Sequence, residues 1–190
     1  MKRFLTLIII GVLFLTPAFA GETESEQAKL LYADANLNES FNLLLTIPEE
    51  ERTAENWLLL GNILQDRGRN DDAIFMYTQA ILKDDKFIKA YYNLGNSYLE
   101  AGKPNMAIVE YKNVIKLRKD YPYAYYNMGC AYVELGEYKK ARNAFLDAIY
   151  YKNTEPDFYY NLAYVYKKLN KQKDAEVYLE LYNKLKENQI

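Results

Sequence analysis

Apolar residues recur along this chain with a period of 34 residues from position 54 onward. Each period holds two clusters whose apolar residues are three, four and seven positions apart, a spacing that places them on one face of an α-helix. The clusters are separated by a residue that tolerates the left-handed conformation in which many helices end: Gly68, Gly102, Gly136 or Asn170. Each period therefore predicts a helix, a tight turn and a second helix.

The most regular positions combine aromatic, aliphatic and small side chains. In the first period they are Trp57, Leu60, Gly61, Leu64, Ala73 and Tyr77. Similar residues stand at intervals of 34 from each of them, and two helices can approach closely where the side chains are small. In spacing and period the pattern resembles the tetratricopeptide repeat.

The resemblance implies an all-α fold, a right-handed α-solenoid of antiparallel helix pairs whose first helices line an inner, concave wall. The four units are 54–87, 88–121, 122–155 and 156–190. The family's proline near the end of each unit is replaced here, whereas Pro122 and Pro156 begin the third and fourth units, where a missing N–H costs nothing. We expect a capping box at Thr154, just before the fourth unit.

Residues 21–53 look like a degenerate copy of the unit. Ser40, Leu44 and Ile47 stand 33 residues before Ala73, Tyr77 and Ala80, and the turn lacks glycine. We predict a helix pair that caps the N-terminal end of the stack. The polar end of the last helix is expected to close the other end.

The first twenty residues have the features of a secretory signal peptide. Lys2 and Arg3 precede an apolar run at 4–15, which is too short to cross a bilayer comfortably, and Ala18-Phe19-Ala20 matches a cleavage site. We predict cleavage after Ala20, a secreted or periplasmic location, and no stable membrane insertion afterwards. The alternative is that these residues remain as an anchor.

The composition argues against catalysis. The chain has no His and one Cys, which excludes Ser-His and Cys-His nucleophiles and His-containing zinc sites. Its eight Gly are spread singly, so no phosphate-binding loop is evident. We therefore predict no enzymatic activity, no cofactor and no metal. Cys130 is interpreted as a small buried residue, or as a reactive thiol if it is exposed.

The charge is divided along the chain. Residues 21–87 carry 14 acidic and 6 basic side chains, a net charge of −8, whereas residues 88–190 have a net charge of +4. Without Lys2 and Arg3 the formal net charge falls from −2 to −4, so no broad basic surface for nucleic acid is expected. The charges have two interpretations, simple solubility or weak head-to-tail self-association of two copies.

The sequence Tyr-Tyr-Asn occurs at 91–93, 125–127 and 159–161. The first Tyr is the family's signature aromatic, and we expect it to pack against a neighbouring helix. The resemblance places the second Tyr and the Asn at the concave groove, where both can bind a partner through aromatic faces and paired amide hydrogen bonds. The predicted partner-binding residues are Asn62, Lys89, Tyr92, Asn93, Asn96, Tyr123, Tyr126, Asn127, Tyr160, Asn161 and Tyr164. Alternatively, the Asn residues hydrogen-bond between adjacent units and hold the stack in register.

These observations favour a non-catalytic scaffold or adaptor of the bacterial periplasm or envelope. It would bind a peptide segment or a helix of another protein in the Tyr/Asn-lined groove. The alternative is that the same aromatic groove binds cell-wall polysaccharide or peptidoglycan, since aromatic faces also stack on sugar rings.

Overall fold

The computed structural model describes residues 17–187, and the chain divides into two compact units, 1–52 and 53–190. Most of the predicted signal peptide, residues 1–16, lies outside the described residues. Among the residues that are described, no helix has the length and apolarity that crossing a membrane requires.

The described part of the N-terminal compact unit, residues 17–52, contains two α-helices and a short 3-10 helix. They are α1 (Pro17–Ala33), α2 (Leu37–Thr46) and η1 (Glu49–Glu51). α1 and α2 pack against each other, and the hydroxyl of Ser40 on α2 donates to the Ala28 carbonyl oxygen on α1 at 2.7 Å. A helix pair thus occupies the segment that the sequence marked as a degenerate repeat, although α1 begins before residue 21. Whether this pair acts as a cap stays a prediction.

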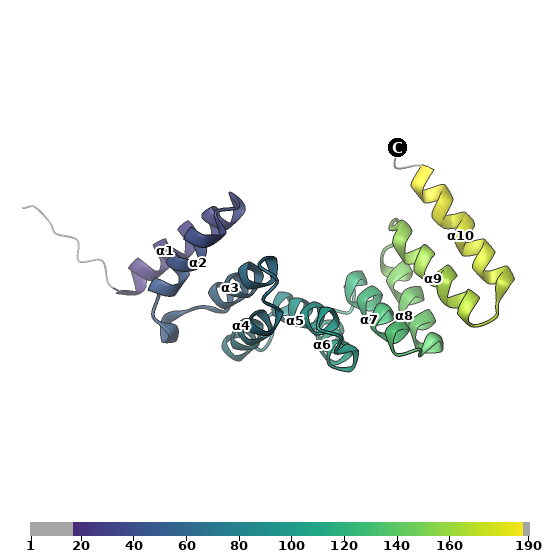
Figure 1. Cartoon of the computed structure of the whole chain (residues 1–190), viewed down its shortest axis with the longest axis horizontal. Coiled ribbons are helices and arrows are strands. Elements are labelled where there is room, and N and C mark those ends of the chain that lie inside the picture. Colours follow the sequence, from purple (N-terminus) through teal and green to yellow (C-terminus); the bar gives the residue numbers. More distant parts are fainter. Residues whose placement is uncertain (1–16, 188–190) are drawn as a thin grey trace, which may run out of the picture. The chain divides into compact units, whose positions relative to one another are not determined.

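The described part of the C-terminal compact unit, residues 53–187, consists of four antiparallel helix pairs (Figure 1). The pairs are α3 (Ala54–Asp66) with α4 (Asn70–Lys83), α5 (Ile88–Glu100) with α6 (Pro104–Leu117), α7 (Pro122–Glu134) with α8 (Tyr138–Tyr151), and α9 (Pro156–Lys168) with α10 (Gln172–Glu187). Each second helix packs against the first helix of the next pair. The predicted all-α solenoid of helix pairs is confirmed.

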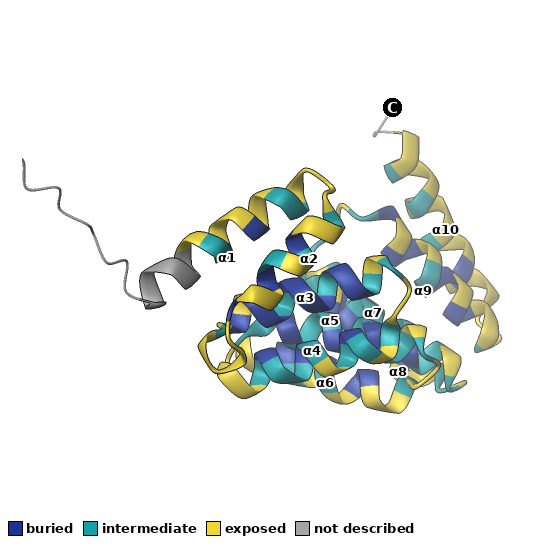
Figure 2. Ribbon diagram, turned by 60° about the vertical axis from the view of Figure 1, so that its left-hand side comes forward, coloured by how far each residue is buried: buried dark blue, intermediate teal, exposed yellow. Residues whose placement is uncertain are grey.

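First helices and second helices form opposite sides of this stack. Neighbouring first helices contact one another, α3 with α5, α5 with α7 and α7 with α9, and no comparable contact joins neighbouring second helices. The first helices therefore line the inner side. Figure 2 shows the buried residues on the faces where helices meet.

The turn inside each pair has the same geometry throughout. Gly68, Gly102, Gly136 and Asn170 all have φ between 57° and 72°, as does Ala35 between α1 and α2. In the turn between α3 and α4 the Arg69 N–H donates to the Leu64 carbonyl oxygen at 2.8 Å, which is the 6→1 hydrogen bond of a Schellman motif. The left-handed turn predicted for each repeat is therefore present, and Ala35 adopts it without the freedom of glycine.

The predicted capping box at Thr154 is wrong. The N-cap residue of α9 is Glu155, whose side chain makes no capping bond. Pro156 occupies the first helical position, so Thr154 lies one residue before the N-cap. The capping box occurs instead at α3. There the Thr53 hydroxyl accepts from the Asn56 N–H at 3.2 Å, and the Asn56 side chain accepts from the Thr53 N–H at 3.0 Å.

A glycine against an aromatic ring sets the distance between the helices of the first three pairs. A Cβ on Gly61, Gly95 or Gly129 would lie 2.4–2.6 Å from a ring carbon of Tyr77, Tyr111 or Phe145 respectively. Real Cβ atoms do not come that close, so only glycine fits there. The fourth pair uses Ala163 and Leu179 at the same positions. A larger residue on the first helix is thus matched by loss of the ring on the second.

This match predicts the effect of Gly129→Ala. The added methyl group overlaps the Phe145 ring, so the free energy of unfolding should fall by about 1–3 kcal/mol. Adding Phe145→Leu reproduces the natural pair of the fourth unit and should recover at least about 0.5 kcal/mol relative to the sum of the single variants. Urea denaturation of the four proteins measures the coupling, and strictly additive effects would show that the contact does not set the spacing.

Candidate partner-binding surface

A chain of hydrogen bonds follows the inner side of the stack from pair to pair. Its first step joins α3, α4 and α5. The amide oxygen of Asn62 accepts from the Tyr77 hydroxyl at 2.9 Å and from Nδ2 of Asn93 at 2.8 Å. One acceptor thus binds the second helix of its own pair and the first helix of the next.

The same arrangement recurs one unit later with an additional bond. Oδ1 of Asn96 accepts from the Tyr111 hydroxyl at 2.9 Å and from Nδ2 of Asn127 at 2.8 Å. Nδ2 of Asn127 also donates to the Tyr92 hydroxyl at 3.0 Å. Burial raises the pKa of Tyr111 and of Tyr92, so both hydroxyls stay protonated at neutral pH.

The third step is simpler because two partners have changed together. Cys130 stands at the position of Asn62 and Asn96 in the earlier pairs. Phe145 stands at the position of the tyrosine whose hydroxyl donates a hydrogen bond to these asparagines. Nδ2 of Asn161 donates instead to the Tyr126 hydroxyl at 2.6 Å. The donor hydroxyl and the acceptor amide are therefore kept or lost as a pair.

These bonds support the structural interpretation of the three asparagines. Asn93, Asn127 and Asn161 each use the amide nitrogen to join adjacent pairs. No hydrogen bond among the described residues uses the amide oxygen of any of the three. Each asparagine therefore joins adjacent pairs through its amide nitrogen and keeps its amide oxygen as an acceptor, so the two roles considered from the sequence are compatible.

The first tyrosine of each triplet packs as predicted. Tyr125 and Tyr159 are 7% and 8% exposed, and Tyr91 is half-buried. The hydroxyl of Tyr159 donates to the carbonyl oxygen of Asn153 at 3.0 Å. The hydroxyl of Tyr91 makes the equivalent bond to Asp85 at 3.2 Å. These bonds tie the first helix to the turn that precedes it.

The second tyrosines divide into two groups. Tyr92 and Tyr126 are half-buried, and their rings take part in packing. Tyr92 lies 5.2 Å from the ring of Tyr121, and Tyr126 stacks on Phe158 at 4.7 Å. Tyr160 alone is open, with 53% of its surface exposed. Only part of the predicted ladder of free aromatic faces is therefore available to a partner.

Three other predicted site residues are exposed: Lys89, Tyr123 and Tyr164. The Tyr123 hydroxyl accepts from Nζ of Lys152 at 2.6 Å and donates to Glu155 at 3.3 Å, and these two also form an ion pair. Lys152 and Glu155 lie outside the repeating positions, so the repeat pattern does not predict this cluster. It places a polar group beside the accessible ring of Tyr123.

Cys130 is poorly suited to redox chemistry. It is half-buried in the core formed by α7, α8 and α9, and burial raises the pKa of its thiol to about 11. At neutral pH the thiolate is the reactive form, and here it is scarcely populated. The interpretation of Cys130 as a packing residue is therefore favoured.

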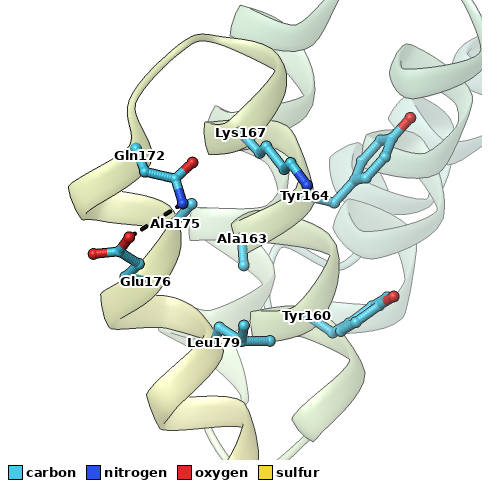
Figure 3. Close-up of a pocket in the computed structure, with 8 residues that line it drawn as sticks. All are labelled: Tyr160, Ala163, Tyr164, Lys167, Gln172, Ala175, Glu176 and Leu179. Carbon is cyan, nitrogen blue, oxygen red and sulfur yellow. Dashed lines mark hydrogen bonds between the residues drawn. The ribbon is translucent and has the colours of Figure 1, made fainter.

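One feature of this region was not predicted from the sequence. A hollow of about 260 Å³ lies between α9 and α10 (Figure 3). Its lining residues are Tyr160, Ala163, Tyr164, Lys167, Gln172, Ala175, Glu176 and Leu179. Several equivalent residues of the previous pair, among them Tyr126, Cys130 and Phe145, pack in clusters with residues of α9.

Family models agree with this architecture. A model described as TPR repeat matches residues 61–102, 95–136 and 129–170, and one described as Tetratricopeptide repeat matches residues 156–189. The chain belongs to the tetratricopeptide-repeat family. No curated protein sequence matches it.

Solved structures of MamA proteins share the fold. One, described as the crystal structure of MamA, is 23% identical with a TM-score of 0.81, and the match covers 85% of this chain and 95% of that chain. MamA 41-end from Desulfovibrio magneticus RS-1 is 17% identical with a TM-score of 0.83, covering 89% and 96% respectively. At this level of identity the likeness shows the fold alone.

The hydrogen-bond chain predicts that Asn127 stabilises the stack. Asn127→Ala removes two bonds and leaves Asn96 with one donor fewer, so the free energy of unfolding should fall by about 1–3 kcal/mol. Asn183→Ala, at an exposed position of α10, is the matched control and should change it by less than about 0.5 kcal/mol. Chemical denaturation measures both, and equal effects would contradict a register role for Asn127.

Proposed function

We propose that this tetratricopeptide-repeat protein is a non-catalytic scaffold that binds a segment of another protein along the inner side of α3, α5, α7 and α9. The observation that carries the proposal is the series of fixed asparagines. Their nitrogens are held by the preceding pair, so their oxygens are already positioned to accept hydrogen bonds from a partner's backbone. Preorganised groups lose little conformational freedom on binding, which favours affinity.

The exposed residues of the same side supply the remaining contacts. Tyr123 and Tyr160 offer aromatic surface with only two side-chain torsions to restrict, and Lys89 offers a positive charge. Among the described residues no group of His, Cys, Asp and Glu could hold a metal ion. The proposal therefore rests on surface recognition, and no step of chemistry is assigned to the chain.

Photocrosslinking tests the inner side directly. A photoreactive phenylalanine analogue at Tyr123 in cells should give a discrete crosslinked protein that mass spectrometry identifies. The same analogue at Phe75, an exposed position on the second helix α4, is the control and should not capture that protein. Lys89→Glu should reduce the yield several-fold.

Crosslinks only at Phe75 would refute the inner surface as the binding side. Crosslinking of Tyr123 to glycan fragments without protein would favour the polysaccharide alternative. Neither substitution is expected to disturb the fold, because Tyr123 and Phe75 are both exposed.

We also propose that the protein is exported, with residues 1–20 as a cleaved signal peptide. The support is the charged start, the short apolar run and the Ala-x-Ala site in the sequence. Intact-mass spectrometry of the protein from its native cells should give a chain that begins at Gly21. A mass that includes Met1–Ala20 would instead favour the retained anchor.

A further inference from the structure

The groove between α9 and α10 has the same construction as the groove in which α9 itself lies. α9 inserts Phe158, Leu162 and Val165 against α7 and α8. Tyr126, Cys130 and Phe145 are among the residues that receive them, in the same two clusters. The residues 34 positions later are Tyr160, Tyr164 and Leu179, and all three line the hollow in Figure 3. The last pair thus presents a receiving surface for one more helix.

This surface is open among the described residues. Tyr160, Tyr164 and Leu179 are 53%, 41% and 42% exposed. The residues equivalent to Leu179 in the three preceding pairs are fully buried. Tyr160 also lies 5.3 Å from the ring of Tyr182, which extends the aromatic wall along α10. Covering an apolar face of this kind with a complementary helix is favourable, because it removes apolar surface from water.

Tyr160 specifies one polar contact of such a helix. In the two preceding pairs the equivalent hydroxyls, of Tyr92 and Tyr126, accept from the amide nitrogen of an asparagine on the next first helix. A helix that docks on α9 in the same way would place a side-chain amide opposite the Tyr160 hydroxyl.

Lys167 specifies a second contact. Its equivalent in the first pair is Gln65, which donates to both carboxylate oxygens of Glu100 on the next first helix at 3.2 Å. Glu100 lies seven residues after Asn93, so both are on one face of α5. Replacing the neutral donor by a lysine turns this contact into one that favours a carboxylate.

We propose that the α9–α10 groove binds an amphipathic helix of a partner protein that carries an Asn opposite Tyr160 and an acidic residue seven positions later opposite Lys167. First helices run parallel to one another, so the C-terminal end of the bound helix lies at Lys167. Positive charge at that end complements the helix dipole. The site is continuous with the interface that joins the pairs, and it shares Tyr160 with the proposed inner binding surface.

The sequence of α5 provides a probe, because it contains both Asn93 and Glu100. A fluorescent peptide of residues 88–100, with a hydrocarbon staple replacing Gly95 and Leu99 on the face opposite Asn93, should bind the full chain in fluorescence anisotropy. Tyr160→Phe, which removes only the hydroxyl, should weaken binding about five-fold, the equivalent of one hydrogen bond. Lys167→Glu should weaken it by a similar factor at low salt.

Lys173→Glu is the matched control, since it makes the same charge change at an exposed position outside the hollow, and it should alter binding less than about two-fold. A peptide with Glu100→Lys should restore binding to the Lys167→Glu protein. The proposal is overturned by absence of binding, by equal losses in the two charge variants, or by failure of the charge swap. Self-association of the chain that Lys167→Glu abolishes, without peptide binding, would also overturn it by assigning the groove to a second copy.

Loss of crosslinking at Tyr123 together with intact peptide binding would separate the two proposals. The first result concerns the inner side of the stack, and the second concerns only the groove at α9 and α10.

Discussion

The close contact between a glycine and an aromatic ring is the constraint on which the rest of the stack depends. In the second pair the ring of Tyr111 occupies the space that a side chain at position 95 would need. Because the ring is fixed there, its hydroxyl donates to Oδ1 of Asn96. The same oxygen also accepts a hydrogen bond from Nδ2 of Asn127 in the next pair. The spacing within a pair thus determines how the following pair is attached.

Departures from this scheme are themselves matched. Where Phe145 removes the hydroxyl, Cys130 removes the amide that would have accepted from it, so no acceptor is stranded between α7 and α8. Where Ala163 replaces glycine, Leu179 replaces the ring. Paired changes of this kind keep each contact satisfied, although the repeats are not identical.

The fold was predictable from the sequence, because the period, the glycine positions and the helical spacing all agree. The roles of individual site residues were less accessible. Spacing places Asn127 near the inner side, but only the packing shows that its nitrogen is engaged and its oxygen is not. Similarly, Tyr121 lies in a turn outside the repeating pattern, so its contact with Tyr92 could not be predicted. The start of the fourth unit at Pro156 was predicted correctly, but its N-cap is Glu155, so Thr154 does not occupy the capping position.

The hydrogen bonds between pairs also bear on how the length of such a protein can change. The unit 88–121 carries Asn93 to donate backward, and Asn96 and Tyr92 to accept from the next unit. A tandem duplication of these residues would therefore give each copy its hydrogen-bond partners in both neighbouring units. The unit 122–155 lacks the amide acceptor, so its duplication would give a weaker junction. Growth or shortening of the array is thus easiest at residues 88–121, because this unit carries both the donor for the preceding unit and the acceptors for the following one.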